Sequence, residues 1–261
     1  MRIQQDMNPI KSSTQALKII VSLSRPSKMP CYSYNIPAKN CIKGSKLRKV
    51  KGSSCSSCYA MNGWYPARYK YLKQRLKAIR HPKWVDAMVH LIKSRKQDYF
   101  RWHDSGDLQG LWHLHKIVQV AKLTPDTKHW LPTIEYEMIQ QYWELHGKIP
   151  MYELVPNLII RLSGLMMDTK PPMKLARKLG VTVSAVSSNG IYTCPAMEQG
   201  HKCLDCRECW SKDNLLIIYK RQKTLSDHTT GNNFASPDYK RTTYRGLPPN
   251  SPVLKNHVQS L

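Results

Sequence analysis

The sequence is poor in acidic residues and in phenylalanine, and it lacks any long apolar run. Its 261 residues include 17 Asp and Glu against 41 Lys and Arg, and Phe occurs only twice. A membrane-spanning helix needs about 20 apolar residues, so we expect no membrane span. The apolar stretch at residues 16–23 is short and lacks a small-residue cleavage site, so we expect a strand rather than a signal peptide. A chain without export is expected in the cytoplasm, or in the host cytoplasm for a phage-encoded protein.

The charge balance is strongly one-sided. The formal net charge is +24, and such an excess of one sign repels itself in the folded state. A polyanionic partner relieves this repulsion, because phosphates release condensed counterions when Lys and Arg replace them. The 14 Tyr and 7 Trp add amphipathic rings on which bases can stack. Nucleic acid is therefore the expected partner, while a solubility surface and an anionic membrane surface are weaker alternatives.

Apolar runs bounded by turn residues predict seven strands, and helical periodicity predicts helices between them. The expected strands cover residues 19–23, 31–36, 99–103, 129–134, 157–162, 181–186 and 215–219. The expected helices cover residues 67–80, 83–94, 108–123, 136–146 and 172–179. Gly180 follows the last of these helices, where a C-cap glycine belongs.

From residue 99 onward the expected strands and helices alternate, which predicts an α/β fold with a parallel sheet. A (β/α) barrel over residues 1–230, possibly incomplete, is the preferred architecture, and an open doubly wound sheet is the second. In either architecture ligands gather at the carboxyl ends of the strands. Residues 231–261 are rich in Pro, Asn, Ser, Lys and Arg, and we expect them to form a basic C-terminal arm.

Four cysteines lie close together late in the chain, in the segment CPAMEQGHKCLDCRECW at residues 194–210. Two residues separate Cys203 from Cys206 and Cys206 from Cys209, and Cys194 lies further upstream. Clustered thiols in a reducing compartment indicate a metal rather than disulfides. We therefore expect a metal-binding insertion at residues 194–210 with four thiolate ligands around zinc. An iron–sulfur cluster suits the same spacing.

A second cysteine group lies early in the chain. Cys55 and Cys58 form a C-x2-C pair, and Cys41 precedes them across a basic loop. Three thiolates with an open position are typical of clusters that bind a cofactor at one iron, so an alternative cofactor is a [4Fe-4S] cluster at Cys41, Cys55 and Cys58. Packing cysteines are the other interpretation.

Acidic residues follow one predicted strand, in the segment FRWHDSGDLQ at residues 100–109. His103, Asp104 and Asp107 end this strand, and the carboxylates could act as nucleophile, general base or base-reading acceptor. Ordinary turn chemistry is the alternative, with Asp107 capping the next helix. We expect the two carboxylates to favour the charged form of His103.

A basic segment with interleaved aromatic residues predicts a nucleic-acid-binding surface, because cations bind phosphates while rings stack on bases. A solvated helix face over a tyrosine-edged core is the alternative. The expected phosphate-binding residues are Arg68, Lys70, Lys73, Arg75, Lys77 and Arg80.

The segment DSGDLQ at residues 104–109 resembles the DSGGFQ signature of tRNA-guanine transglycosylases. The expected barrel with a late thiolate-rich zinc site is also similar to those enzymes. Their DNA-directed branch, the DpdA family of phages and bacteria, inserts 7-deazaguanines into DNA and shields phage genomes from restriction. The resemblance implies a glycosyltransferase that exchanges guanine in DNA for a 7-deazaguanine base.

The same resemblance implies roles for individual residues. Asp104 would be the acid or base beside the exchanged base, and Cys203, Cys206 and Cys209 would be zinc ligands. Asp168 is the nearest candidate for the second carboxylate, which acts as the nucleophile.

A second resemblance competes with the first. CSSCYA at residues 55–60, HDSGD at residues 103–107 and the late cysteines look like a set of small phage proteins of unassigned function. Their pattern in turn is similar to radical-SAM-like barrels. This resemblance implies an iron–sulfur enzyme with an auxiliary centre at the late cysteines. A non-catalytic, zinc-stabilised DNA-binding protein is the third alternative.

Overall fold

The computed structural model describes residues 9–62 and 64–221 of the chain. The basic arm expected at residues 231–261 lies outside the described residues. Within them, no helix is long and apolar enough to cross a membrane.

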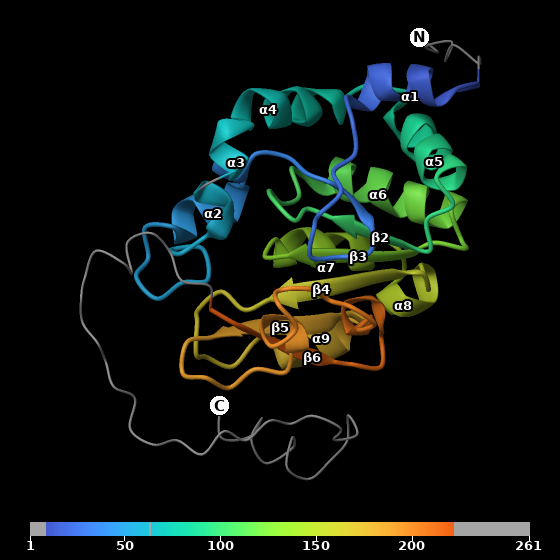
Figure 1. The fold of residues 1–261 in the computed structure, drawn as a ribbon. Coiled ribbons are helices and arrows are strands. Elements are labelled where there is room, and N and C mark those ends of the chain that lie inside the picture. Colours follow the sequence, from blue (N-terminus) through green and yellow to red (C-terminus); the bar gives the residue numbers. More distant parts are fainter. Residues whose placement is uncertain (1–8, 63, 222–261) are drawn as a thin grey trace.

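A sheet of six parallel strands forms the centre of the molecule (Figure 1). The strands are β1 (Tyr32–Tyr34), β2 (Tyr99–Trp102), β3 (Lys128–Thr133), β4 (Leu158–Ser163), β5 (Thr182–Ser187) and β6 (Leu216–Lys220). They follow one another in the sheet in sequence order, so β1 and β6 form its two edges. Each neighbouring pair is parallel. The expected α/β class and parallel sheet are therefore confirmed.

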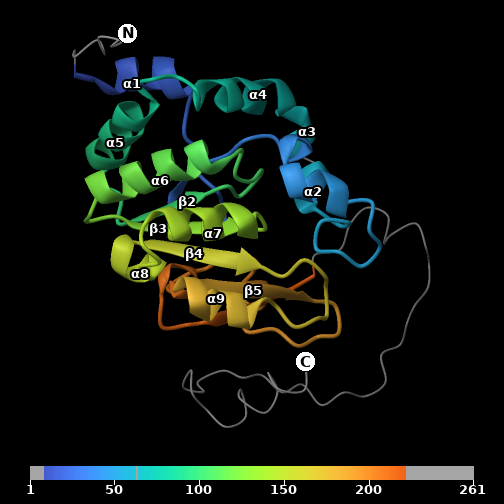
Figure 2. The same cartoon turned by 180° about the vertical axis from the view of Figure 1, so that it is seen from behind.

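Helices connect the strands and cover one face of the sheet, and Figure 2 shows α6, α7 and α9 in front of it. The helices are α1 (Ser13–Ile20), α2 (Ile42–Leu47), α3 (Trp64–Ala67), α4 (Tyr69–Ala78), α5 (Trp84–Ser94), α6 (Leu111–Leu123), α7 (Tyr136–Leu145), α8 (Met151–Leu154) and α9 (Met173–Leu179). Gly180 ends α9 with a φ of +66°, which confirms its expected role as a C-cap glycine.

The strand expected at residues 19–23 is wrong, because helix α1 extends to Ile20 and residues 21–23 form neither helix nor strand. Ser12 begins the helix, since its side chain accepts a 3.2 Å hydrogen bond from the Gln15 N–H. Ala16 and Ile20 lie one helical turn apart and are both buried as the helix packs on α5. This four-residue spacing is helical, and eight apolar-rich residues are too few to decide between helix and strand from their pattern alone.

The two faces of the sheet carry different side chains. On the helix-covered face the strands contribute Tyr34, Phe100, Trp102, Leu131 and Leu162 to the main hydrophobic core. Successive residues of a strand point to opposite faces, so the other face receives Ser33, Arg101, Trp130, Arg161 and Tyr219. We call this second face the polar face.

The long connection between β5 and β6, residues 188–215, covers the polar face. It contains two short 3-10 helices, η3 (Pro195–Met197) and η4 (Glu208–Trp210). The second of these packs against β3 and β4. Figure 1 shows this orange segment in front of the sheet, on the side away from α6, α7 and α9. The cysteine-rich insertion thus forms a layer of its own on the sheet.

Candidate functional site at the carboxyl ends of the strands

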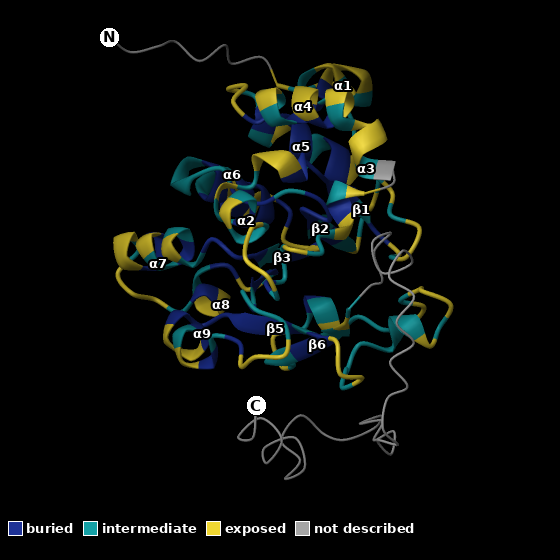
Figure 3. Cartoon of the chain, turned by 90° about the vertical axis from the view of Figure 1, so that its left-hand side faces the viewer, coloured by how far each residue is buried: buried dark blue, intermediate teal, exposed yellow. Residues whose placement is uncertain are grey.

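The carboxyl ends of the strands lie at the left of Figure 1, where the arrowhead of β4 points. Figure 3 looks at the molecule from this side and shows α2 lying across the strand ends. Loops of parallel sheets meet at this edge, so residues distant in the sequence can form one site. Two of the predicted groups are found here, the acidic segment after β2 and the early cysteines after β1.

Asp104 is buried at the end of β2, with 7% of its surface exposed. Its carboxylate accepts hydrogen bonds from the Ser33 hydroxyl at 3.3 Å and from the Tyr65 phenol at 3.0 Å. Its N–H donates to Oδ1 of Asn35 at 3.0 Å. Burial raises the pKa of Asp104, while the Arg101 guanidinium and the two hydroxyl donors act in the opposite direction. The carboxyl group is therefore held in a fixed orientation and is biased toward protonation.

The carboxylate of Asp107 is held by three hydrogen bonds from the backbone and from one threonine. Its carboxylate accepts hydrogen bonds from the Thr133 hydroxyl at 2.6 Å, the Leu108 N–H at 2.7 Å and the Ile134 N–H at 3.0 Å. These donors join the end of β2 to the end of β3. Burial raises the pKa of Asp107 to about 7, despite the opposing effect of the three donors. The carboxylate predicted to be catalytic thus connects two strand ends, and helix α6 begins further on, after Gly110.

His103 differs from the expectation that it favours its charged form. The side chain is 3% exposed, and burial lowers the pKa of His103 to about 3, with the Arg101 guanidinium acting in the same direction. Within residues 9–62 and 64–221 neither ring nitrogen has a hydrogen-bond partner. Its backbone has a φ of +53°, which is uncommon outside glycine. Desolvation therefore outweighs the neighbouring carboxylates, and His103 is a neutral ring beside His113, 5.2 Å away between ring centroids.

Asp168 lies after β4. Its carboxylate accepts hydrogen bonds from the Ser188 N–H, at 2.8 Å, and from the Ser188 hydroxyl. Its own N–H donates to the Val186 carbonyl at 3.0 Å. Asp168 thus connects the ends of β4 and β5, and the catalytic roles expected for Asp104, Asp107 and Asp168 stay predictions.

The early cysteines lie in the connection that follows β1, and this connection extends across the strand ends. The Lys43 N–H donates to Glu135 after β3 at 2.8 Å. Further along, the Ser54 N–H donates to the Leu165 carbonyl at 2.8 Å, and the Ser54 hydroxyl donates to Gly164 at 2.6 Å. The loop that carries Cys41, Cys55 and Cys58 is thereby attached to the ends of β3 and β4.

The three early thiols are close neighbours. A β-carbon built on Gly44 would lie 2.9 Å from Cβ of Cys41 and 3.5 Å from Sγ of Cys55, so both cysteines border the same small space. Burial raises the pKa of the Cys55 thiol to about 12, and the Cys58 thiol acts in the same direction. The Arg48 guanidinium is the opposing positive charge beside Cys41, Cys55 and Cys58.

The late cysteines lie on the polar face rather than at the strand ends. Trp210 fixes this segment, because its indole N–H donates to the Phe100 carbonyl at 3.0 Å and its ring packs on Tyr99 and Trp130. Sγ of Cys209 lies 3.3 Å from the Tyr219 hydroxyl. Burial raises the pKa of Cys203 and of Cys209 to about 11. The thiols of Cys206 and Cys209 further raise the pKa of Cys203.

Neither cysteine group has the geometry of a completed single-ion site. Across the part of the chain that the structure describes, no three or more His, Cys, Asp or Glu side chains are arranged to hold one metal ion. The eight cysteines are free thiols. Zinc and iron–sulfur ligation by Cys194, Cys203, Cys206 and Cys209 therefore stay predictions.

The predicted nucleic-acid surface lies along α4 and the residues just before and after it. Five of the six expected residues are exposed: Arg68, Lys70, Lys73, Lys77 and Arg80. Arg75 departs from the expected set, because it is 2% exposed and donates hydrogen bonds to the Ser22 and Ser24 hydroxyls at 2.5 and 2.9 Å. A shallow hollow of about 400 Å³ lies beside Arg68, Lys70 and Tyr71. This hollow offers cations and one aromatic ring to a ligand.

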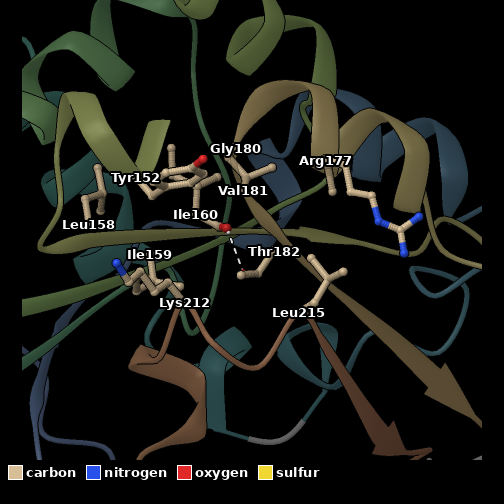
Figure 4. A pocket seen from close by; sticks show the side chains of 11 residues that line it. Tyr152, Leu158, Ile159, Ile160, Arg177, Gly180, Val181, Thr182, Lys212 and Leu215 are labelled. Carbon is tan, nitrogen blue, oxygen red and sulfur yellow. Dashed lines mark hydrogen bonds between the residues drawn. The ribbon is translucent and has the colours of Figure 1, made fainter. Parts of the chain in front are cut away.

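A second pocket, of about 230 Å³, lies at the amino ends of β4 and β5, between α8 and α9 (Figure 4). Tyr152, Leu158 and Val181 contribute to its apolar lining, while Arg177 and Lys212 stand at its sides. No residue predicted from the sequence to be functional lines this pocket.

Comparison with protein families gives a match over most of the chain. The family model described as Gene product 88 matches residues 8–230. The chain belongs to the gene product 88 family. No curated protein and no solved structure matches it. The matched residues of this chain include both cysteine groups and Asp104.

Sequence reasoning missed several residues of the gene product 88 site. Arg101 lies on β2 beside Asp104, with its guanidinium 4.3 Å from the centre of the Trp130 ring. Burial would lower the pKa of Arg101, but the neighbouring Tyr59 and Asp104 raise it above its ordinary value. Tyr59 donates to the Asp104 carbonyl, and Tyr65 donates to its carboxylate. Ser33 on β1 pairs with Arg101 on β2, and this pairing brings the groups together. The sequence pattern of one strand does not reveal how that strand is aligned with its neighbour.

Proposed function

We propose that this gene product 88 chain is an iron–sulfur enzyme built on an incomplete (β/α) barrel, and that Cys41, Cys55 and Cys58 hold a [4Fe-4S] cluster. One observation supports the proposal most strongly. The three thiols share the connection after β1, and this connection crosses the carboxyl ends of a parallel sheet whose strands follow sequence order. Ligands of parallel α/β folds bind at these ends.

The residues around the early thiols fit such a cluster. Gly44 leaves open the space that a β-carbon would fill between Cys41 and Cys55. Arg48 supplies positive charge beside the three thiols, which suits an anionic metal–thiolate group.

Three protein thiolates leave one iron of a four-iron cluster free to bind a cofactor. When bound, such a cluster supplies one-electron reduction to a sulfonium cofactor such as S-adenosylmethionine. The chain's own residues have different tasks. Asp104, oriented by Ser33 and Tyr65, can hold a proton on its carboxyl group, and Arg101 can bind an anionic group of the ligand.

The proposed substrate class is nucleic acid, with DNA as the specific proposal. The net charge of +24 and the exposed basic residues of α4 and its flanks support it. A phosphate backbone bound along α4 would reach the edge of the molecule where α2 and α3 lie, and Figure 1 shows these helices beside the carboxyl ends of the strands.

Anaerobic reconstitution tests the cluster. The full chain is incubated with iron and sulfide, and iron, sulfide and the electron paramagnetic resonance of the reduced protein are measured. We expect the double variant Cys55→Ser, Cys58→Ser to lose about four irons per chain relative to the wild type. Adding S-adenosylmethionine is expected to alter the resonance signal of the wild type only.

The matched control is Ser56→Ala, Ser57→Ala, which changes the same loop without removing a thiol. This variant is expected to retain the iron of the wild type. Equal iron contents in the cysteine variant and the wild type would exclude a cluster at the early cysteines.

The DpdA-type exchange of guanine for a 7-deazaguanine is the second proposed function, and Asp104 supports it. This carboxyl group is buried, oriented and biased toward protonation at a strand end, as an acid beside a base would be. In this proposal Cys194, Cys203, Cys206 and Cys209 hold structural zinc, and the product protects phage DNA from restriction.

Nucleoside analysis separates the two functions. DNA is taken from cells that express the chain and are supplied with a 7-deazaguanine, and it is digested and examined by mass spectrometry. A modified deoxynucleoside that disappears with Asp104→Asn and persists with Cys55→Ser, Cys58→Ser would favour base exchange. A product lost in the cysteine variant would favour the iron–sulfur enzyme, and unmodified DNA would count against base exchange.

A further inference from the structure

The structure brings a fifth cysteine to the late group. Cys31 lies directly before β1, far from residues 194–210 in the sequence. It is 4% exposed and packs with Trp130 and Trp210 in a small cluster that also contacts Cys209. The N–H of Cys203 donates to the Lys28 carbonyl at 2.8 Å, which attaches the late segment to the residues before β1.

The surroundings of Cys31 contain two further thiols, a guanidinium group and one carboxylate. Burial raises the pKa of the Cys31 thiol to about 12; the Arg101 guanidinium opposes this shift, and Asp104 and the thiols of Cys203 and Cys209 add to it. Arg101 and Arg161 also lie close enough to lower the pKa of Cys209. In the described part of the chain neither arginine forms a salt bridge, although Asp104 acts to raise the pKa of Arg101 and Glu208 that of Arg161.

We propose that Cys31 is a ligand of a metal–thiolate centre on the polar face, together with Cys203, Cys209 and a fourth thiolate from the late segment. Cysteine thiolates select soft metals, zinc or an iron–sulfur cluster. Four thiolates outweigh the charge of a divalent metal, so the centre is anionic, and the guanidinium groups of Arg101 and Arg161 near Cys209 would offset its charge. The centre also ties the amino end of β1 to the connection between β5 and β6.

Ligation by Cys31 differs from packing in its response to substitution. Cys31→Val keeps the volume and the apolar character of the side chain but removes the thiol. Cys31→His is larger and polar but can bind a metal. If Cys31 is a ligand, the His variant retains metal better than the Val variant; if Cys31 only packs, the Val variant behaves like the wild type and the His variant is the worse one.

The test uses the full chain with Cys55→Ser and Cys58→Ser, so that metal at the early group does not contribute. Cobalt(II) is added anaerobically as the probe, and the intensity of the thiolate-to-cobalt charge-transfer absorption is measured per bound metal. With Cys31→Val this intensity is expected to fall by about a quarter, because one of four thiolates is lost. Zinc competition gives the affinity, which is expected to weaken by more than the roughly 10- to 100-fold that loss of an outer-shell partner costs.

A parallel sample receives iron and sulfide, and iron retention distinguishes a cluster from a zinc centre in the same background. Circular dichroism is recorded at each metal concentration, so that folding driven by metal is also followed. Unchanged cobalt intensity, zinc affinity and iron content in Cys31→Val would overturn the proposal. So would a His variant that binds metal more weakly than the Val variant, including the case in which only the His variant fails to fold.

Discussion

The two faces of one sheet have opposite characters in this protein. The helix-covered face is an apolar core built from residues such as Phe100, Trp102 and Leu131. The polar face carries the half-buried Arg101 and the fully buried Arg161 beneath a cysteine-rich connection. Successive residues of each strand point to opposite faces of the sheet. One residue of a strand therefore packs in the apolar core, while the next belongs to the polar face. Substitutions at adjacent positions are therefore expected to have effects of different kinds.

The largest effect is expected from Trp102→Ala on the helix-covered face. The ring is fully buried and packs on Phe100 and Trp84, with centroids 4.8 and 5.9 Å away. Its loss is expected to lower the free energy of unfolding by about 3–5 kcal/mol. Equilibrium urea unfolding measures this change. The zinc affinity of the remaining folded protein should not change, because the proposed metal ligands lie on the polar face. A large loss of zinc affinity would show that the two faces do not act independently.

Arg161→Met on the polar face is expected to have the next largest effect. The guanidinium donates to the carbonyls of Val183, Glu208, Ser211 and Asn214 at 2.9–3.3 Å. Leaving buried acceptors without a donor is expected to cost about 1–3 kcal/mol. Hydrogen exchange should accelerate first at residues 208–214, ahead of the strands. Arg177→Met, on the exposed surface of α9, is the control and should leave both measurements unchanged.

Asp107→Asn is expected to change how stability depends on pH. The pKa of Asp107 is about 7 in the folded state against 3.8 for the free group. Between these values the unfolded chain has released the proton that the folded chain retains, so stability falls as pH rises, by up to about 1.4 kcal/mol per pH unit. Urea unfolding from pH 4 to pH 7 should show a shallower decline in the variant. An identical decline in both proteins would contradict the raised pKa.

The smallest effect is expected from Lys73→Gln on α4, which leaves both faces of the sheet intact. If α4 binds the phosphate backbone, the logarithm of DNA affinity should depend less steeply on the logarithm of salt concentration, by about 1 in slope. Fluorescence anisotropy with a DNA duplex measures this slope. Lys174→Gln, an equally exposed lysine on α9, should leave it unchanged. If the two variants show equal slopes, Lys73 on α4 does not contact the phosphate backbone of DNA.

The six strands could be predicted because most of their residues are buried or half-buried, and most strands appear as short apolar or aromatic runs between turn residues. Helix α1 could not, since Ala16 and Ile20 fit either element until the Ser12 cap and the packing on α5 decide between them. The class of the fold therefore follows from the sequence, while the ends of individual elements depend on tertiary contacts.

The candidate site was predictable only where its residues are neighbours in the sequence. The acidic segment and both C-x2-C patterns are local, and they were identified. Arg101 and Cys31 were not, because their roles depend on strand register and on a connection that folds back from β5 to the start of β1. Asp107 was identified, but its three hydrogen-bond donors, which indicate a structural role, lie partly on the next strand.

Sequential strand order also bears on how the protein is made. Each strand pairs with the one synthesised just before it, so the sheet can grow strand by strand as the chain leaves the ribosome. Cys31 emerges with the first strand, but Cys203 and Cys209 follow only near the end. Until they arrive, the thiol of Cys31 and the ring of Trp130 have no cover from the late connection. The nascent chain thus passes through a stage in which these groups are exposed to oxidation and aggregation, and synthesis of the connection between β5 and β6 ends that stage.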